Sequence, residues 1–139
     1  MKKTMSVFLA VVFLTAVFTI PASAVPASDQ IDSYSITIVS RGSGGVEVTA
    51  NVIGTHPWMT RIGFPVITIY ERLNSSSSWV NVRTVTSQWN PNATAGSHSH
   101  VLTYSGVAGR QYRAEVQFFA RDSLGSDTRG DFSRIITAT

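Results

Sequence analysis

The chain has 139 residues, a formal net charge of +3 and no cysteine. The absence of cysteine excludes disulfides, thiolate metal sites and cysteine nucleophiles. Both lysines, Lys2 and Lys3, precede residue 25, and the remainder carries nine arginines against eight acidic residues, a net charge of +1. Because the net charge of this part is close to zero, the sequence gives no reason to expect nucleic acid or an anionic membrane as a partner.

The first 24 residues have the organisation of a secretory signal. A short basic start is followed by an apolar run from Val7 to Ile20, and Pro21 then leads into Ala22-Ser23-Ala24. This order predicts a cleaved signal peptide over residues 1–24, because the run is shorter than the roughly 20 residues that span a bilayer. Residues 25–33 are polar and aperiodic, and we expect a flexible leader there. No lipobox cysteine, sortase-type tail or second apolar segment follows, so we expect a secreted, extracellular protein without a stable membrane anchor.

From Tyr34 onward, β-branched and aromatic residues alternate with polar residues, and clusters of glycine, serine and asparagine interrupt them. No segment has the 3.6-residue period of a helix, so the pattern predicts an all-β protein. The expected strands are 34–39, 46–52, 62–73, 79–89, 98–105, 111–121 and 131–139. Seven antiparallel strands are the number found in a minimal immunoglobulin-like β-sandwich. Residues 34–139 are therefore expected to form one sandwich domain.

Three of these strands carry further information in their apolar pattern. In 46–52 and 111–121 the apolar residues, with the exception of Phe119, fall on one face, namely Val46, Val48, Ala50, Val52, Tyr112, Ala114, Val116, Phe118 and Ala120. The strand 62–73 has Phe64, Val66 and Tyr70 on one side and Ile67, Ile69 and Leu73 on the other, which predicts a central strand. Proline has no N–H to donate to a neighbouring strand, so a bulge or a free edge is expected at Pro65.

The stretch Val107-Ala108-Gly109-Arg110-Gln111-Tyr112-Arg113-Ala114-Glu115-Val116 resembles the corner between the fifth and sixth strands of fibronectin type III domains. In that family a tyrosine at this corner is buried, and its hydroxyl reaches back to the backbone upstream. The resemblance assigns this role to Tyr112. The continuation Ala120-Arg121-Asp122, Gly125 and Phe132-Ser133 is also similar to the family's passage into its last strand. The resemblance implies a fibronectin-III-like sandwich.

Taken whole, the chain resembles a group of small secreted proteins of Gram-positive bacteria that have no assigned function. The likeness lies in the signal peptide, the strand 66–73, the serine-rich turn, the strand opening Trp79-Val80-Asn81-Val82 and the dipeptide Tyr112-Arg113. This resemblance covers nearly the whole chain and implies no activity.

Four aromatic residues are candidates for a binding platform, because aromatic side chains on loops and strand ends make good anchors for sugars or apolar partners. They are Trp58, Tyr70, Trp79 and Trp89. The alternative is that these side chains simply pack in the core or at its rim. Trp79 and Trp89 are ten residues apart and would share a face of a regular strand, but one bulge would separate them.

Two shorter motifs also suggest ligands. His98 and His100 are two residues apart, so in a strand they point the same way and could chelate a metal, although no third ligand is evident nearby. The alternative is a polar strand end. Arg129-Gly130-Asp131 is the integrin-recognition tripeptide, and it falls in the loop expected before the last strand. A three-residue match also arises readily by chance.

No catalytic motif is present: the chain has no G-x-S-x-G elbow, no H-E-x-x-H and no phosphate-binding glycine loop. We therefore expect a protein that is not an enzyme, that needs no cofactor and that acts by surface contact with a protein or glycan. The alternatives are a secreted antibacterial or toxin-like protein and a small secreted hydrolase.

Overall fold

The computed structural model describes residues 29–139, so the expected signal peptide and the start of the leader lie outside the described residues. The described residues form eight strands: β1 (Ile31–Gly42), β2 (Gly45–Gly54), β3 (Arg61–Arg72), β4 (Val80–Trp89), β5 (Ser97–Ser105), β6 (Gln111–Arg121), β7 (Ser126–Phe132) and β8 (Ile136–Thr137). In this part of the chain there is no helix of the length and hydropathy that a bilayer crossing requires.

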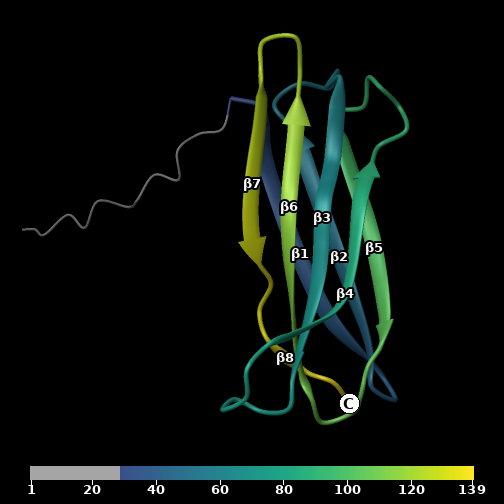
Figure 1. Cartoon of the computed structure of the whole chain (residues 1–139). Helices are drawn as coiled ribbons and strands as arrows, with labels where there is room; N and C mark the ends of the chain where they lie inside the picture. Colours follow the sequence, from purple (N-terminus) through teal and green to yellow (C-terminus); the bar gives the residue numbers. More distant parts are fainter. Residues whose placement is uncertain (1–28) are drawn as a thin grey trace, which may run out of the picture.

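The strands form two antiparallel sheets that face each other in two layers (Figure 1). The first sheet has the order β1-β2-β5. The second has the order β4-β3-β6-β7, and β8 pairs with the beginning of β6. The expected all-β architecture of two antiparallel sheets is confirmed.

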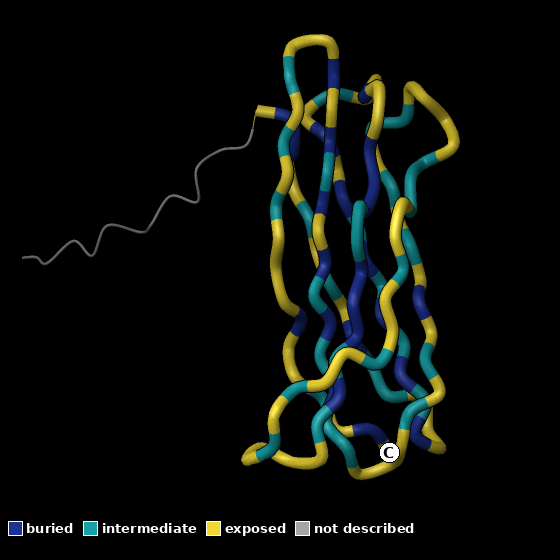
Figure 2. The backbone as a smooth tube through the Cα atoms, in the orientation of Figure 1, coloured by how far each residue is buried: buried dark blue, intermediate teal, exposed yellow. Residues whose placement is uncertain are grey.

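The core lies between the two sheets, where the described chain is buried along the inner strands (Figure 2). The inward residues of β2 and β6 are those that their two-residue period predicts, and each is at most 1% exposed: Val46, Val48, Ala50, Val52, Tyr112, Ala114, Val116, Phe118 and Ala120. Ile38 from β1 and Ile62, Phe64, Ile67 and Ile69 from β3 belong to the same cluster. Period-two burial on facing strands therefore builds the sandwich.

The strand β3 contains the bulge that Pro65 predicts, since its register with β6 shifts between Gly63 and Val66. The extra residue turns Phe64 to the same side as Ile67 and Ile69, and all three are completely buried. The expectation that Phe64 shares a face with Val66 and Tyr70 is therefore wrong. That expectation assumed that inward and outward side chains alternate without a break through Pro65, where the bulge interrupts the alternation.

The first strand begins earlier than expected. β1 starts at Ile31, which is buried, so residues 31–33 belong to the sheet and not to a flexible leader. The backbone N–H of Thr55 donates to the carbonyl of Gln30 at 3.1 Å, which fastens this end of the strand to the loop after β2.

The end of the chain also differs from expectation. Residues 126–130, expected as part of a loop, open strand β7, and the single strand expected over 131–139 is divided into β7 and β8. Ser133 makes the break between them, where its hydroxyl accepts a hydrogen bond from the Ala114 N–H at 2.8 Å. β7 lies at the edge of its sheet and is largely exposed, so its sequence lacks the apolar alternation that marks a buried strand.

Candidate binding surfaces

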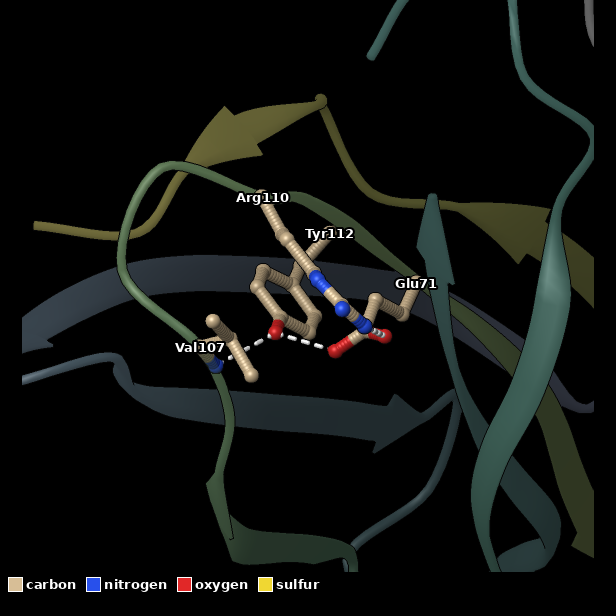
Figure 3. Close-up of polar contacts among 4 residues, drawn as sticks. All are labelled: Glu71, Val107, Arg110 and Tyr112. Atoms are coloured by element: carbon tan, nitrogen blue, oxygen red, sulfur yellow. Dashed lines mark hydrogen bonds and ion pairs between the residues drawn. The ribbon is translucent and has the colours of Figure 1, made fainter. Parts of the chain in front are cut away.

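Tyr112 lies in a buried polar network at the turn between β5 and β6 (Figure 3). Its hydroxyl donates a hydrogen bond to Glu71 on β3 and accepts one from the backbone N–H of Val107 at 2.8 Å. Arg110 forms an ion pair with the other oxygen of Glu71. Burial, and then the hydrogen bond to Glu71, raise the pKa of Tyr112 to about 12, so the hydroxyl stays protonated at neutral pH.

This network joins three segments at one end of the sandwich. The Glu71 carboxylate, 9% exposed, receives the Tyr112 hydroxyl and the Arg110 guanidinium, so both of its oxygens have partners. A buried carboxylate requires such partners to be stable. Because the Tyr112 hydroxyl and both oxygens of Glu71 already have partners, the network holds these segments of the fold together.

The outward face of the second sheet carries what we term the arginine–aromatic cluster: Tyr70, Arg72, Trp79, Arg113 and Phe132. The Arg113 guanidinium lies 4.6 Å from the centroid of the Trp79 ring and 4.5 Å from that of Phe132. The Arg72 guanidinium lies 4.4 Å from the centroid of Trp79. Two cations therefore already lie over the Trp79 ring, and this ring is not an open stacking surface for a sugar.

Trp89 lies on the same outward face but at the other end of β3. The Arg61 guanidinium is 3.9 Å from its ring centroid, and the Phe119 ring packs against it edge-on at 5.5 Å. Tyr70, Trp79 and Trp89 therefore share one face of the sheet without forming a single platform. The expectation of a common aromatic platform missed the arginines that cover these rings.

Trp58 lies apart from the other three candidate aromatics, on the loop between β2 and β3. It is 63% exposed, and its indole stacks on the His56 imidazole with a centroid separation of 5.5 Å. Leu124, 85% exposed, occupies the turn between β6 and β7 at the same end of the molecule (Figure 1). We define the loop end as residues 55–60, 90–96 and 122–125.

Backbone hydrogen bonds brace the loop end. The Thr60 N–H donates to the Arg121 carbonyl at 2.7 Å, which ties the first loop to the start of the third. The Gly54 N–H donates to the Gly96 carbonyl at 2.8 Å, which ties β2 to the second loop. In the third loop, the Asp122 carboxylate accepts from the N–H groups of Leu124 and Gly125 at 2.7 and 2.9 Å. The two exposed apolar side chains thus project from fixed backbone.

The histidine pair lies on the inner side of β5. His98 and His100 are in register with Val52 and Ala50, whose side chains face the core, and the His98 ring lies 5.4 Å from the Phe64 ring. Residues 29–139 contain no group of three His, Cys, Asp or Glu side chains that could hold a metal ion. Burial, and secondarily the neighbouring His100, lower the pKa of His98 from its ordinary 6.5.

The position of His98 predicts a loss of stability in mild acid. A folded pKa below that of the unfolded chain means that the unfolded state binds the proton more readily, so stability falls as pH drops through about 6.5. Groups facing His98 are Phe64 and Val52, with His100 beside it, and none is an acid. The difference in thermal midpoint between wild type and His98→Gln is expected to shrink from pH 7.5 to 5.5. His56→Gln, in the loop end, serves as the control, and parallel curves for His98→Gln and wild type would refute the assignment.

The Arg129-Gly130-Asp131 tripeptide lies in β7, and its expected position in a loop is wrong. Arg129 and Asp131 are in register with Phe118 and Val116, so they lie on the inner side of the edge strand, whereas Gly130 lies on the outer side. Charged residues that point inward from an edge strand hinder pairing with another sheet. This placement gives the two charged residues a role in protecting the edge.

The structure thus separates the sequence-predicted residues among several surfaces, and the signals that sequence reasoning missed were the exposed Leu124 and the arginines stacked on the tryptophans. A comparison with known proteins finds no matching family model, no matching curated protein and no matching solved structure.

Proposed function

We propose that this protein is a secreted, non-enzymatic β-sandwich of the fibronectin type III kind, and that its loop end binds an extracellular protein. Two features support the finer fold assignment. The sheet β1-β2-β5 packs against the sheet β4-β3-β6-β7, as in that family, and a buried tyrosine, Tyr112, lies at the start of strand β6. The signal-like N-terminal sequence supports secretion, as it does in the small Gram-positive proteins that the chain resembles.

The observation that carries the functional proposal is the exposure of Trp58 and Leu124, at 63% and 85%, on loops of one end. Tryptophan is the residue most enriched among those that dominate the binding energy of protein interfaces. Immunoglobulin-like domains also commonly recognise partners through the loops at one end of the sandwich. A braced backbone supports binding further, because little conformational freedom is lost when the partner docks.

The chemistry of the loop end favours a protein over a glycan as the partner. One face of the Trp58 indole is taken by His56, and the second exposed anchor, Leu124, has no ring on which a sugar could stack. An indole and an aliphatic side chain exposed at one end suit apolar pockets with a polar rim, which is the usual anatomy of a protein interface.

The test compares variants of the loop end for retention on cells. Fluorescently labelled protein is incubated with intact bacterial cells, and retention is measured by flow cytometry for wild type, Trp58→Ser/Leu124→Ser and Leu73→Ser. Leu73 is a matched control, since it is 62% exposed but follows β3 at the opposite end. The double variant is expected to bind at least about tenfold more weakly, because truncating interface anchors costs about 2 kcal/mol or more. Leu73→Ser is expected to bind as wild type does.

Pretreatment of the cells with protease is expected to abolish retention. Retention that survives protease, or an equal loss in Leu73→Ser, would count against a protein partner at the loop end. Leakage of a cytoplasmic dye at the same protein concentrations would favour the toxin-like alternative, and turnover of chromogenic substrates would favour the hydrolase.

A further inference from the structure

The charges of the two outer sheet faces differ sharply. The side chains of β6 alternate, and Tyr112 to Ala120 face the core at every second position, so Arg113 and Arg121 point outward. Arg61 and Arg72 of β3 flank the same outer face, opposite Arg121 and Gln111. Glu115 is the one acidic residue among these outward positions of β3 and β6, which gives four positive charges against one negative.

The outer face of the first sheet has no such excess. Its outward positions carry mainly hydroxyl and amide side chains: Ser33, Ser35, Thr37, Thr49, Asn51, Ser97, Ser99 and Thr103. The acid on that face, Glu47, forms an ion pair with Arg41. The nearly neutral total charge therefore conceals one basic sheet face.

At one end of the basic face, two arginines lie directly opposite each other. Arg61 and Arg121 are register partners, and they line a shallow hollow with Thr60, Asp122 and Ser123. The Asp122 carboxylate is held by the N–H groups of Leu124 and Gly125, and it forms no ion pair with either arginine. Like charges directly across a strand pair are unfavourable, and an anion between the two guanidinium groups would relieve this repulsion.

At the other end, the arginines of the arginine–aromatic cluster also lack an acidic partner. Arg72 donates from Nε to the Gln111 side chain at 2.8 Å, and the Arg113 guanidinium lies over the rings of Tyr70, Trp79 and Phe132. The nearby Glu115 accepts a hydrogen bond from the Tyr70 hydroxyl at 2.7 Å. Among residues 29–139, no ion pair joins Arg72 or Arg113 to a carboxylate.

The surface between the two arginine pairs carries one charged side chain, Glu115, whose carboxylate accepts a hydrogen bond from the Tyr70 hydroxyl, beside exposed side chains that are uncharged. Arg72 lies eleven positions after Arg61 along β3, which is roughly 35 Å of extended strand. The exposed outward side chains in between are Thr84, Thr86, Gln117 and Thr128, in register with β3 or β6. These groups suit a ligand that carries hydroxyls along its length, which a polyphosphate chain lacks.

We propose that this outer face binds a carboxylated polysaccharide that lies along β3 and β6. Its carboxylates pair with Arg61 and Arg121 at one end and with Arg72 and Arg113 at the other, and its hydroxyls face the threonines between them. An acidic peptide offers carboxylates without the hydroxyls that the middle of the face would bond. The Arg61–Arg121 end of this surface adjoins the loop end through Thr60, Asp122 and Ser123, but neither Trp58 nor Leu124 lines that hollow.

The experiment measures the binding of fluorescein-labelled oligogalacturonate by fluorescence anisotropy at low salt. The principal variant is Arg61→Gln/Arg121→Gln, and the control with the same charge change is Arg41→Gln/Arg83→Gln. Arg41 lies on the other sheet, and Arg83 is in register with Ile69, whose side chain faces the core. Removing the arginine pair is expected to raise the Kd about tenfold, since charge-assisted hydrogen bonds are the strongest that a surface offers. Unfolding midpoints of both variants verify that they fold.

Three further ligands and one further variant complete the design. Methyl-esterified oligogalacturonate is expected not to bind, and Trp58→Ser/Leu124→Ser is expected to bind oligogalacturonate as wild type does. The proposal is overturned if the methyl ester binds equally well, if the control variant loses as much affinity as the principal variant, or if wild type does not bind at all. Equal or tighter binding of polyglutamate or polyphosphate would also overturn it, since the face would then recognise any polyanion.

Discussion

Tyr112→Phe is expected to lower the free energy of unfolding by about 3 kcal/mol, although the substitution removes a single oxygen atom. That oxygen donates to the Glu71 carboxylate and accepts from the Val107 N–H. Without it, the carboxylate of Glu71, a residue that is 9% exposed, keeps only Arg110 as a partner, and the Val107 N–H loses its acceptor. Chemical denaturation monitored by circular dichroism measures the effect.

Tyr70→Phe provides the matched control, because its hydroxyl also donates to a carboxylate, that of Glu115, but on the outer face of the sheet. There the loss is expected to stay below about 1 kcal/mol, because water replaces the missing partner. Equal losses in the two variants would mean that burial of the Tyr112 network contributes nothing.

The same network predicts that the stability of the fold decreases at alkaline pH. The pKa of Tyr112 is raised to about 12 in the folded protein, against about 10 in an unfolded chain. A raised folded pKa contributes stability that is complete below pH 10 and is lost as the pH rises toward 12. The Tyr112→Phe variant is expected to lack this contribution. The difference in free energy of unfolding between wild type and the variant should therefore narrow from pH 10 to pH 12.

Gly44→Ala is expected to cost roughly 3–4 kcal/mol, the second large effect. Gly44 lies in the turn between β1 and β2 with a φ of +80°. A Cβ atom there would lie 2.5 Å from the carbonyl oxygen of Gly106 and 2.9 Å from the backbone nitrogen of Ala108. Backbone atoms cannot rotate away as a side chain can, so the turn between β5 and β6 would have to move.

Gly42→Ala separates backbone strain from this clash. Gly42 has the same φ of +80°, but nothing lies within 4 Å of the Cβ position. Its substitution is therefore expected to cost only the conformational strain of about 1–2 kcal/mol. Urea unfolding of the two variants measures the difference, and a Gly44→Ala variant as stable as Gly42→Ala would show that the two turns are not in contact.

Strands with one buried face could be predicted from the sequence, whereas the edge strand β7 could not. β2 and β6 alternate because one face of each meets the opposite sheet, and this burial selects apolar residues at every second position. β7 lies at the edge, where few positions are buried, so its Ser-Asp-Thr-Arg-Gly-Asp sequence reads as a loop. The face predicted for Phe64 is wrong because a bulge reverses which residues of the strand point inward on its two sides, and its exact position decides which residues these are.

The candidate surfaces were predictable only in part, for a different physical reason. Aromatic residues are conspicuous in a sequence, so Trp58, Trp79 and Trp89 could be selected as candidates. Which arginine covers which ring depends on strand register: Arg61 and Trp89 are 28 positions apart, yet the guanidinium lies 3.9 Å from the ring centroid. The basic sheet face is hidden for the same reason, since the total charge says nothing of how charges divide between the faces.

The role of the loop end is tested most directly by hydrogen–deuterium exchange of the protein while it is bound to cells. Amides of residues 55–60 and 122–125, which surround Trp58 and Leu124, are expected to exchange more slowly in the bound state than in free protein. Unchanged exchange in both segments, on cells that retain the protein, would contradict binding through the loop end.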